Sequence, residues 1–209
     1  MPVLLNTQDA DFEKNFTALL SAKREDSPDV DSSVARIIAD VQQRGDAAVL
    51  DLTEKYDGVA LRAEELQISA AEIEAACAQV GAKERSALEL AAARITAYHE
   101  KQKPEDAYWT DSTGAELGWR WTPISAAGLY VPGGLASYPS SVLMNAIPAK
   151  VAGVSRLSVV VPCPDGILNP LVLLACHIAG VDEVYRIGGA QAIAALAYGT
   201  QTIAPVDKI

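Results

Sequence analysis

Two glycine pairs stand where a chain could bind an anion through its backbone. Gly133 and Gly134 follow one apolar run, and Gly188 and Gly189 follow another. Glycine has no Cβ, so a phosphate can approach its backbone closely. A helix that begins just after such a pair offers free N–H groups and a partial positive charge to that phosphate. These residues therefore suggest the binding of a phosphate-bearing ligand such as a nucleotide.

Tyr130 and Gln191 lie beside these pairs, and each could stack on a nucleotide or hydrogen-bond to it. Neither pair fits the G-x-G-x-x-G pattern of dinucleotide-binding turns. Each pair also fits an ordinary tight turn between a strand and a helix with no ligand, and Tyr130 also fits a buried strand tyrosine with a satisfied hydroxyl. The residues alone leave both interpretations open.

Histidines and cysteines offer little further chemistry. His99 and His177 each fall inside an apolar helical pattern, where a structural role is expected. The chain has three cysteines with no CxxC spacing, so they predict buried thiols in a reducing compartment and no cysteine-ligated zinc site: Cys77, Cys163 and Cys176.

The elements that must position these residues alternate between strand and helix after residue 112. Strands are predicted at residues 117–122, 126–131, 157–161 and 183–187, and helices at 140–151, 168–179 and 191–198. Ser140 or Ser141 is expected to cap the first of these helices. This alternation predicts parallel βαβ units, hence a Rossmann-like α/β lobe over residues 113–209. Residues 205–209 resemble the opening of another strand, so we expect the lobe to be incomplete at its C-terminal end.

The region 1–112 is predicted to be mainly helical. Apolar residues recur at helical spacing, and Ser69 with Glu72 forms a capping-box pattern at a helix start. The last long helix of this region should end near Pro104, because the residue before a proline avoids the helical conformation. The sequence thus predicts an α/β protein with a helical N-terminal region.

Composition and charge argue against two classes of partner, nucleic acids and membranes. The chain has 209 residues, half of them hydrophobic and 21% charged, which is typical of a folded domain. The net charge of −10, without a run of Lys or Arg, argues against binding nucleic acid. The longest apolar stretch, residues 171–181, is too short to cross a bilayer, and the first residues do not resemble a signal peptide. A cytoplasmic protein is expected.

Several long motifs resemble the histidinol dehydrogenase family and occur in that family's order. They cover essentially the whole chain, including its helical first part, and stand at residues 44–49, 121–124, 128–134, 138–153, 188–199 and 206–209. Motifs of this length are far more specific than a glycine pair.

The resemblance implies an enzyme that oxidises L-histidinol to L-histidine in two successive NAD-dependent steps through an aldehyde, the last reaction of histidine biosynthesis. It also implies zinc dependence and a homodimer with intertwined subunits and Rossmann-like lobes. By motif, Tyr130 and Gln191 match NAD-binding positions. Further backbone contacts are expected from the two glycine pairs: Gly133, Gly134, Gly188 and Gly189.

The family's zinc ligands, its Glu-His acid/base pair, its substrate-contacting residues and a further NAD-contacting asparagine are expected downstream of Ile209. The resemblance therefore places no catalytic residue and no metal ligand in this chain, and the chain alone is expected to be inactive. Two alternatives stay open: a short non-catalytic relative that binds a nucleotide or a partner, and a dehydrogenase of the same family that acts on another alcohol.

Overall fold

The computed structural model describes residues 4–23, 28–132 and 138–209. The chain forms two compact units, residues 1–36 and 37–209, and the division falls within helix α2 (Pro28–Arg44). The predicted boundary after residue 112 lies inside the second unit, close to the change from helices to strands. As a statement about domains, that boundary stays a prediction.

The first unit contains helix α1 (Phe12–Lys23) and the first part of α2. Phe12 and Phe16, one turn apart on α1, stack with ring centroids 5.4 Å apart and planes within 9°. Their spacing is the helical periodicity seen in the sequence, which places both rings on one face of the helix.

The second unit is built on a parallel sheet of β3 (Ala126–Tyr130), β4 (Arg156–Val160) and β5 (Glu183–Tyr185), in that order. Helices α6 (Pro139–Ala152) and α7 (Pro170–Ile178) connect successive strands. The strands are mostly apolar, as is typical of strands covered on both faces, although they also contain Arg156, Ser158 and Glu183. The predicted α/β class with parallel βαβ units is confirmed.

Both outer strands of this sheet have a further short neighbour. On the β5 side, Ile68 donates its N–H to the Val184 carbonyl, and Arg186 donates to the Leu66 carbonyl. On the β3 side, Lys208 forms a parallel bridge with Ala127. The expected strand opening near the end of the sequence therefore pairs with β3.

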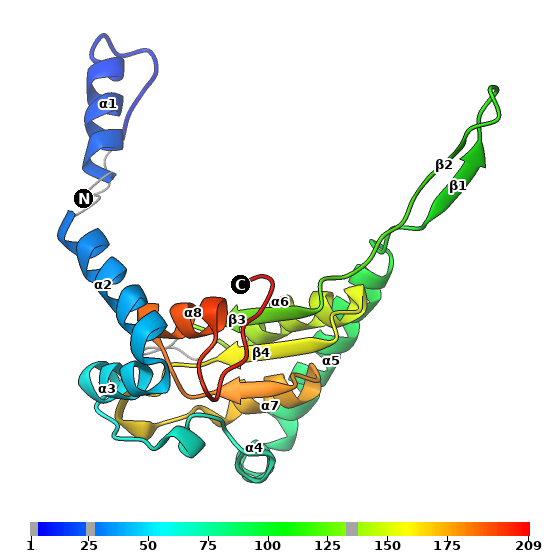
Figure 1. Ribbon diagram of the computed structural model, residues 1–209. Helices are drawn as coiled ribbons and strands as arrows, with labels where there is room; N and C mark the ends of the chain where they lie inside the picture. Colours follow the sequence, from blue (N-terminus) through cyan, green and yellow to red (C-terminus); the bar gives the residue numbers. More distant parts are fainter. Residues whose placement is uncertain (1–3, 24–27, 133–137) are drawn as a thin grey trace. The chain divides into compact units, whose positions relative to one another are not determined.

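Helices cover the sheet on both faces (Figure 1). One face packs against α6 and α7, with α4 and α5 outside them; the other packs against α8, with α3 and the end of α2. Leu157 and Val159 point into the first core, and Val160 and Tyr185 into the second. The helices not yet bounded are α3 (Asp46–Asp57), α4 (Ala70–Ala78), α5 (Ala82–Glu100) and α8 (Gly189–Tyr198), with short 3-10 turns η1 (Ala63–Glu65) and η2 (Pro164–Gly166).

Two local predictions differ from the structure. The predicted strand near residue 117 is β2 (Glu116–Trp119), but it pairs antiparallel with the unpredicted β1 (Ala107–Thr110) in a separate hairpin. The serine cap of α6 was wrong: Pro139 occupies the first helical turn and Tyr138 is the N-cap, so both serines lie inside the helix. Proline favours the first turn because its fixed φ is already helical.

The predicted capping box at α4 is confirmed and extended by an ion pair. The Ser69 hydroxyl accepts from the Glu72 N–H, and the Glu72 carboxylate accepts from the Ser69 N–H at 2.9 Å. Arg186, beyond β5, also donates to Glu72 at 2.6 Å. Hydrogen bonding from Arg186 is the main cause that lowers the pKa of Glu72 from 4.5 to about 2.

We expect Glu72→Gln to reduce the free energy of unfolding at pH 7 by about 1 kcal/mol or less, because the Glu72 side chain is half exposed and screened by solvent. A lowered folded-state pKa gives stability that is present above pH 4.5 and is lost as pH falls towards 2. Urea unfolding at pH 7, 4 and 2 should show the two proteins converging. Glu89→Gln, on an exposed part of α5, is the control, and a constant gap across this range would contradict the prediction.

Candidate functional site

The strand order of the sheet marks one place for a ligand. The chain runs outward from β3 through β4 to β5, and then returns through α8 to residues 206–208 on the other side of β3. The order of strands thus reverses at β3. In open α/β sheets, ligands bind beyond the carboxyl ends of the strands at such a reversal. The carboxyl end of β3 is Tyr130.

The structure brings Tyr130 to the start of α8. The Tyr130 hydroxyl accepts a hydrogen bond of 3.1 Å from the N–H of Gly189, 59 residues away in the sequence. Tyr130 is half-buried at the last position of β3, and Gly189 is the first residue of α8. Two of the residues singled out in the sequence therefore form one corner of the molecule.

Steric contacts and backbone conformation explain the two glycines at the start of α8. A Cβ on Gly188 would lie 2.7 Å from the Cβ and Cγ of Pro162, the second residue after the end of β4. Gly189 has φ +63°, a left-handed conformation that favours glycine. A Cβ on Gly189 would lie 2.5 Å from Oε1 of Gln191, so the glutamine amide lies against the glycine backbone.

Gln191 is a buried polar side chain without a partner. It is 1% exposed, and its amide makes no hydrogen bond within the part of the chain that the structure describes. Its polar atoms are not among the fully buried, unsatisfied side-chain atoms of the described residues, which are Thr53 Oγ1, Asp57 Oδ2 and Arg186 Nε, so the amide keeps some access to solvent. An amide at such a place can exchange that water for a ligand. A ligand with a hydrogen-bonding edge would satisfy it.

The start of α8 adds free backbone donors beside this amide. Across residues 4–23, 28–132 and 138–209, the N–H groups of Ala190 and Gln191 find no acceptor. The first N–H groups of a helix and its dipole favour an anion. The corner can therefore hold a phosphate by its backbone and a polar group by Gln191, next to the aromatic ring of Tyr130. Gly133 and Gly134 lie outside the described residues.

Comparison with known proteins identifies the family. The family model described as histidinol dehydrogenase matches residues 20–209. The chain belongs to the histidinol dehydrogenase family. The resemblance inferred from the motifs is thereby confirmed.

Relatives in the histidinol dehydrogenase family align along the whole chain. The histidinol dehydrogenase of Ruegeria pomeroyi is 73% identical over 209 residues, which are 100% of this chain and 48% of the relative. That of Cereibacter sphaeroides is 69% identical over the same lengths, again 100% and 48%. A crystal structure of histidinol dehydrogenase from Elizabethkingia anophelis superimposes with a TM-score of 0.83 at 33% identity, over 88% of this chain and 42% of that one. The chain spans about half the length of the curated relatives it matches.

The thiols of this histidinol dehydrogenase family member are buried. Cys163 follows Pro162, is fully buried, and donates to the Arg186 carbonyl at 3.4 Å. Burial raises the pKa of the Cys163 thiol to about 11 and that of Cys176 to about 12. A protonated, buried thiol is a poor nucleophile. The cysteines therefore contribute packing. Pro162, which the sequence analysis did not single out, shapes the glycine turn at the start of α8, and no local signal in the sequence marks that role.

Metal ligands do not converge in the part of the chain that the structure describes. No group of three His, Cys, Asp or Glu side chains there could hold a metal ion. His99 is half-buried near the end of α5 and packs edge-on against Tyr98, and His177 is exposed on α7. Zinc, which needs three or four such ligands, does not fit these residues.

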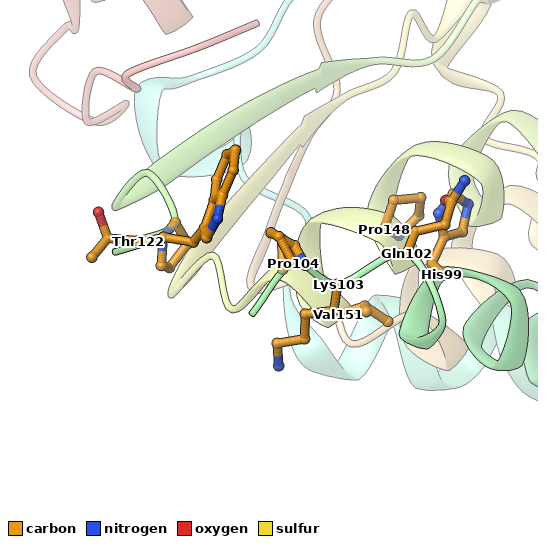
Figure 2. A pocket seen from close by; sticks show the side chains of 10 residues that line it. His99, Gln102, Lys103, Pro104, Thr122, Pro148 and Val151 are labelled. Atoms are coloured by element: carbon orange, nitrogen blue, oxygen red, sulfur yellow. The ribbon is translucent and has the colours of Figure 1, made fainter. Parts of the chain in front are cut away.

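A hollow lies away from the Tyr130 corner. It has a volume of about 400 Å³ and is formed where the end of α5, the segment before β3 and the last turns of α6 meet. Figure 2 shows Thr122 at one end and His99, Gln102 and Pro148 at the other. The lining is mainly proline, tryptophan and aliphatic carbon, with no carboxylate, so it offers no acid/base pair.

Among the described helices, none is long and apolar enough to cross a membrane.

Proposed function

We propose that this chain is the NAD-binding part of a histidinol dehydrogenase that oxidises L-histidinol to L-histidine in two steps through the aldehyde. The observation that carries the proposal is the corner where the Tyr130 hydroxyl meets the Gly189 N–H, beside the unpartnered amide of Gln191. This corner lies at the strand reversal of a chain that belongs to the family.

The residues of this corner fit the parts of a dinucleotide. The free N–H groups of Ala190 and Gln191 suit a phosphate, and the Tyr130 ring suits a flat ring system. The Gln191 amide can donate to and accept from a polar ring substituent. Bound NAD supplies the hydride acceptor for both oxidation steps. The chain's own residues bind and orient that cofactor, while their backbone glycines let it approach.

The rest of the activity is assigned outside these 209 residues. We infer that zinc, the acid/base pair and the contacts to L-histidinol come from polypeptide that the longer relatives contain and this chain does not. The homodimer and the cytoplasmic location are also part of the proposal. They are supported by membership of the family, whose members are biosynthetic enzymes.

The test is a calorimetric titration of the 209-residue chain with NAD, paired with an assay for NADH formation on L-histidinol. We expect saturable NAD binding and no NADH. In Gln191→Leu, NAD affinity should fall about tenfold, which corresponds to the loss of one or two hydrogen bonds to the ligand. The free energy of unfolding should stay about equal, because the Gln191 amide makes no hydrogen bond to the described residues.

Two results would contradict the proposal. A folded wild-type chain that binds no NAD would remove the nucleotide site. Histidinol-dependent NADH formation by this chain would show that acid/base groups lie within it. Ile193→Leu, an outward-facing position on the same helix, is the matched control and should change neither affinity nor stability.

A further inference from the structure

Asp207 binds the backbone at the start of β3. One carboxylate oxygen accepts from the N–H groups of Ser125 and Ala126, both at 2.9 Å, and the Asp207 N–H donates to the Ala126 carbonyl at 3.0 Å. Two residues further on, Gly128 donates to the Lys208 carbonyl at 2.8 Å. These four bonds fix one register between residues 206–208 and β3.

The same short segment is also fixed to α8. The Val206 N–H donates to the Leu196 carbonyl at 2.9 Å. Side chains of both residues meet over Gly128, where a Cβ would lie 3.0 Å from a methyl group of each. Residues 206–208, β3 and α8 are therefore held together at one point, and the other end of α8 carries the Gly189 contact to Tyr130.

We propose that Asp207 is a positioning residue for the nucleotide site: by fixing residues 206–208 against β3, it sets where α8 places Gly189 and Gln191 relative to Tyr130. This inference rests on the proposed function. A shift of one residue in a parallel pair would turn the side chains of the segment to the opposite face, so the register decides which side chains contact α8. Asp207 itself lies at the amino end of β3 and touches no part of the corner at Tyr130.

Asp182 provides a matched comparison within the same sheet. Its carboxylate accepts from the Leu157 N–H at 2.7 Å, and its own N–H donates to the Leu157 carbonyl at 3.1 Å, which joins the start of β5 to β4. It also pairs with Lys150 at 2.7 Å. Asp182 thus makes the same kind of contact as Asp207, at a pair of strands where the order does not reverse.

The experiment compares Asp207→Ala, Asp207→Asn and Asp182→Ala in the 209-residue chain. NAD affinity is measured by calorimetry well below the melting temperature, and amide hydrogen exchange is measured for each protein. Asp207→Ala should weaken NAD binding at least fivefold and speed exchange at Gly128 and Gly189. Asp207→Asn keeps an oxygen that accepts both N–H groups, so it should restore affinity to within about twofold of wild type.

Asp182→Ala should lower the melting temperature and speed exchange at Leu157, with NAD affinity unchanged within twofold. The inference is overturned if Asp207→Ala binds NAD as wild type does, or if Asp182→Ala weakens binding equally, since general loosening would then be the cause. If the wild-type chain binds no NAD, the proposed function is wrong, and so is the role of Asp207 as a positioning residue for the nucleotide site. Exchange at Gly128 still reports separately whether Asp207 holds the strand register.

Discussion

Replacing Gly188 by alanine is expected to destabilise the protein and to abolish most of its NAD affinity. The new methyl group would lie 2.7 Å from two atoms of the Pro162 ring and 3.2 Å from its Cα, none of which can rotate away. Overpacking of this kind costs about 1–3 kcal/mol, or roughly 2–12 °C of melting temperature at this chain length. The turn must also move, and it carries the start of α8, so NAD affinity should fall more than tenfold.

Gly81→Ala is the matched control for this change. Gly81 is also the N-cap of a helix with an ordinary negative φ, so the intrinsic effect of replacing a capping glycine is the same. Its added methyl group would meet only a carboxylate oxygen of Glu84, which can rotate. Thermal unfolding of the two variants measures the difference, and equal melting temperatures would refute the steric role of Pro162.

Tyr130→Ala is expected to weaken NAD binding roughly 5- to 150-fold, the range found when an aromatic ring that stacks on a base is removed. The ring lies at the carboxyl end of β3 at the strand reversal, where a nucleotide would stack on it. Because the ring also packs against the second core, the variant should lose some stability as well, and affinity is compared well below its melting temperature. Calorimetric titration with NAD measures this effect. In a longer protein that carries the family's metal ligands, bound zinc per chain should stay unchanged.

Tyr130→Phe separates the ring from the hydroxyl. It removes the bond from Gly189 but keeps the aromatic face, so NAD affinity should stay within about threefold of wild type. An unchanged affinity in Tyr130→Ala would take Tyr130 out of the site. Equal losses in both variants would assign its role to the hydroxyl instead of the ring.

Local signals in the sequence were reliable where neighbours along the chain decide the structure. The Ser69–Glu72 cap, the end of α5 before Pro104 and the alternating strands and helices all depend on residues a few positions apart. The hairpin strand at residues 107–110 gave no such signal, because most of its side chains are exposed on both faces and no apolar alternation marks it.

Contacts between distant segments could be predicted only where topology implies them. Parallel strands place their carboxyl ends along one edge, which is why Tyr130 and Gly189 could be expected to be near each other. The residues around Glu72 do not predict its hydrogen-bond partner Arg186, which lies 114 residues away in the sequence. Likewise the role of Pro162 appears only when β4 and the turn before α8 are seen together.

The pairing of Leu66 and Ile68 with the edge of β5 has a consequence for how the chain folds during synthesis. Helices α3 and α4 flank this segment, and Asp46 at the start of α3 accepts hydrogen bonds from Thr202, 156 residues later. These contacts cannot form until Thr202 has been synthesised, which at 5–20 residues per second takes roughly 10–40 s. Contacts of such long sequence separation also slow folding. The N-terminal helices of the second unit are therefore synthesised before the segments that cover them, and their apolar faces stay exposed to solvent until then. Chaperones would act on the nascent chain during this interval.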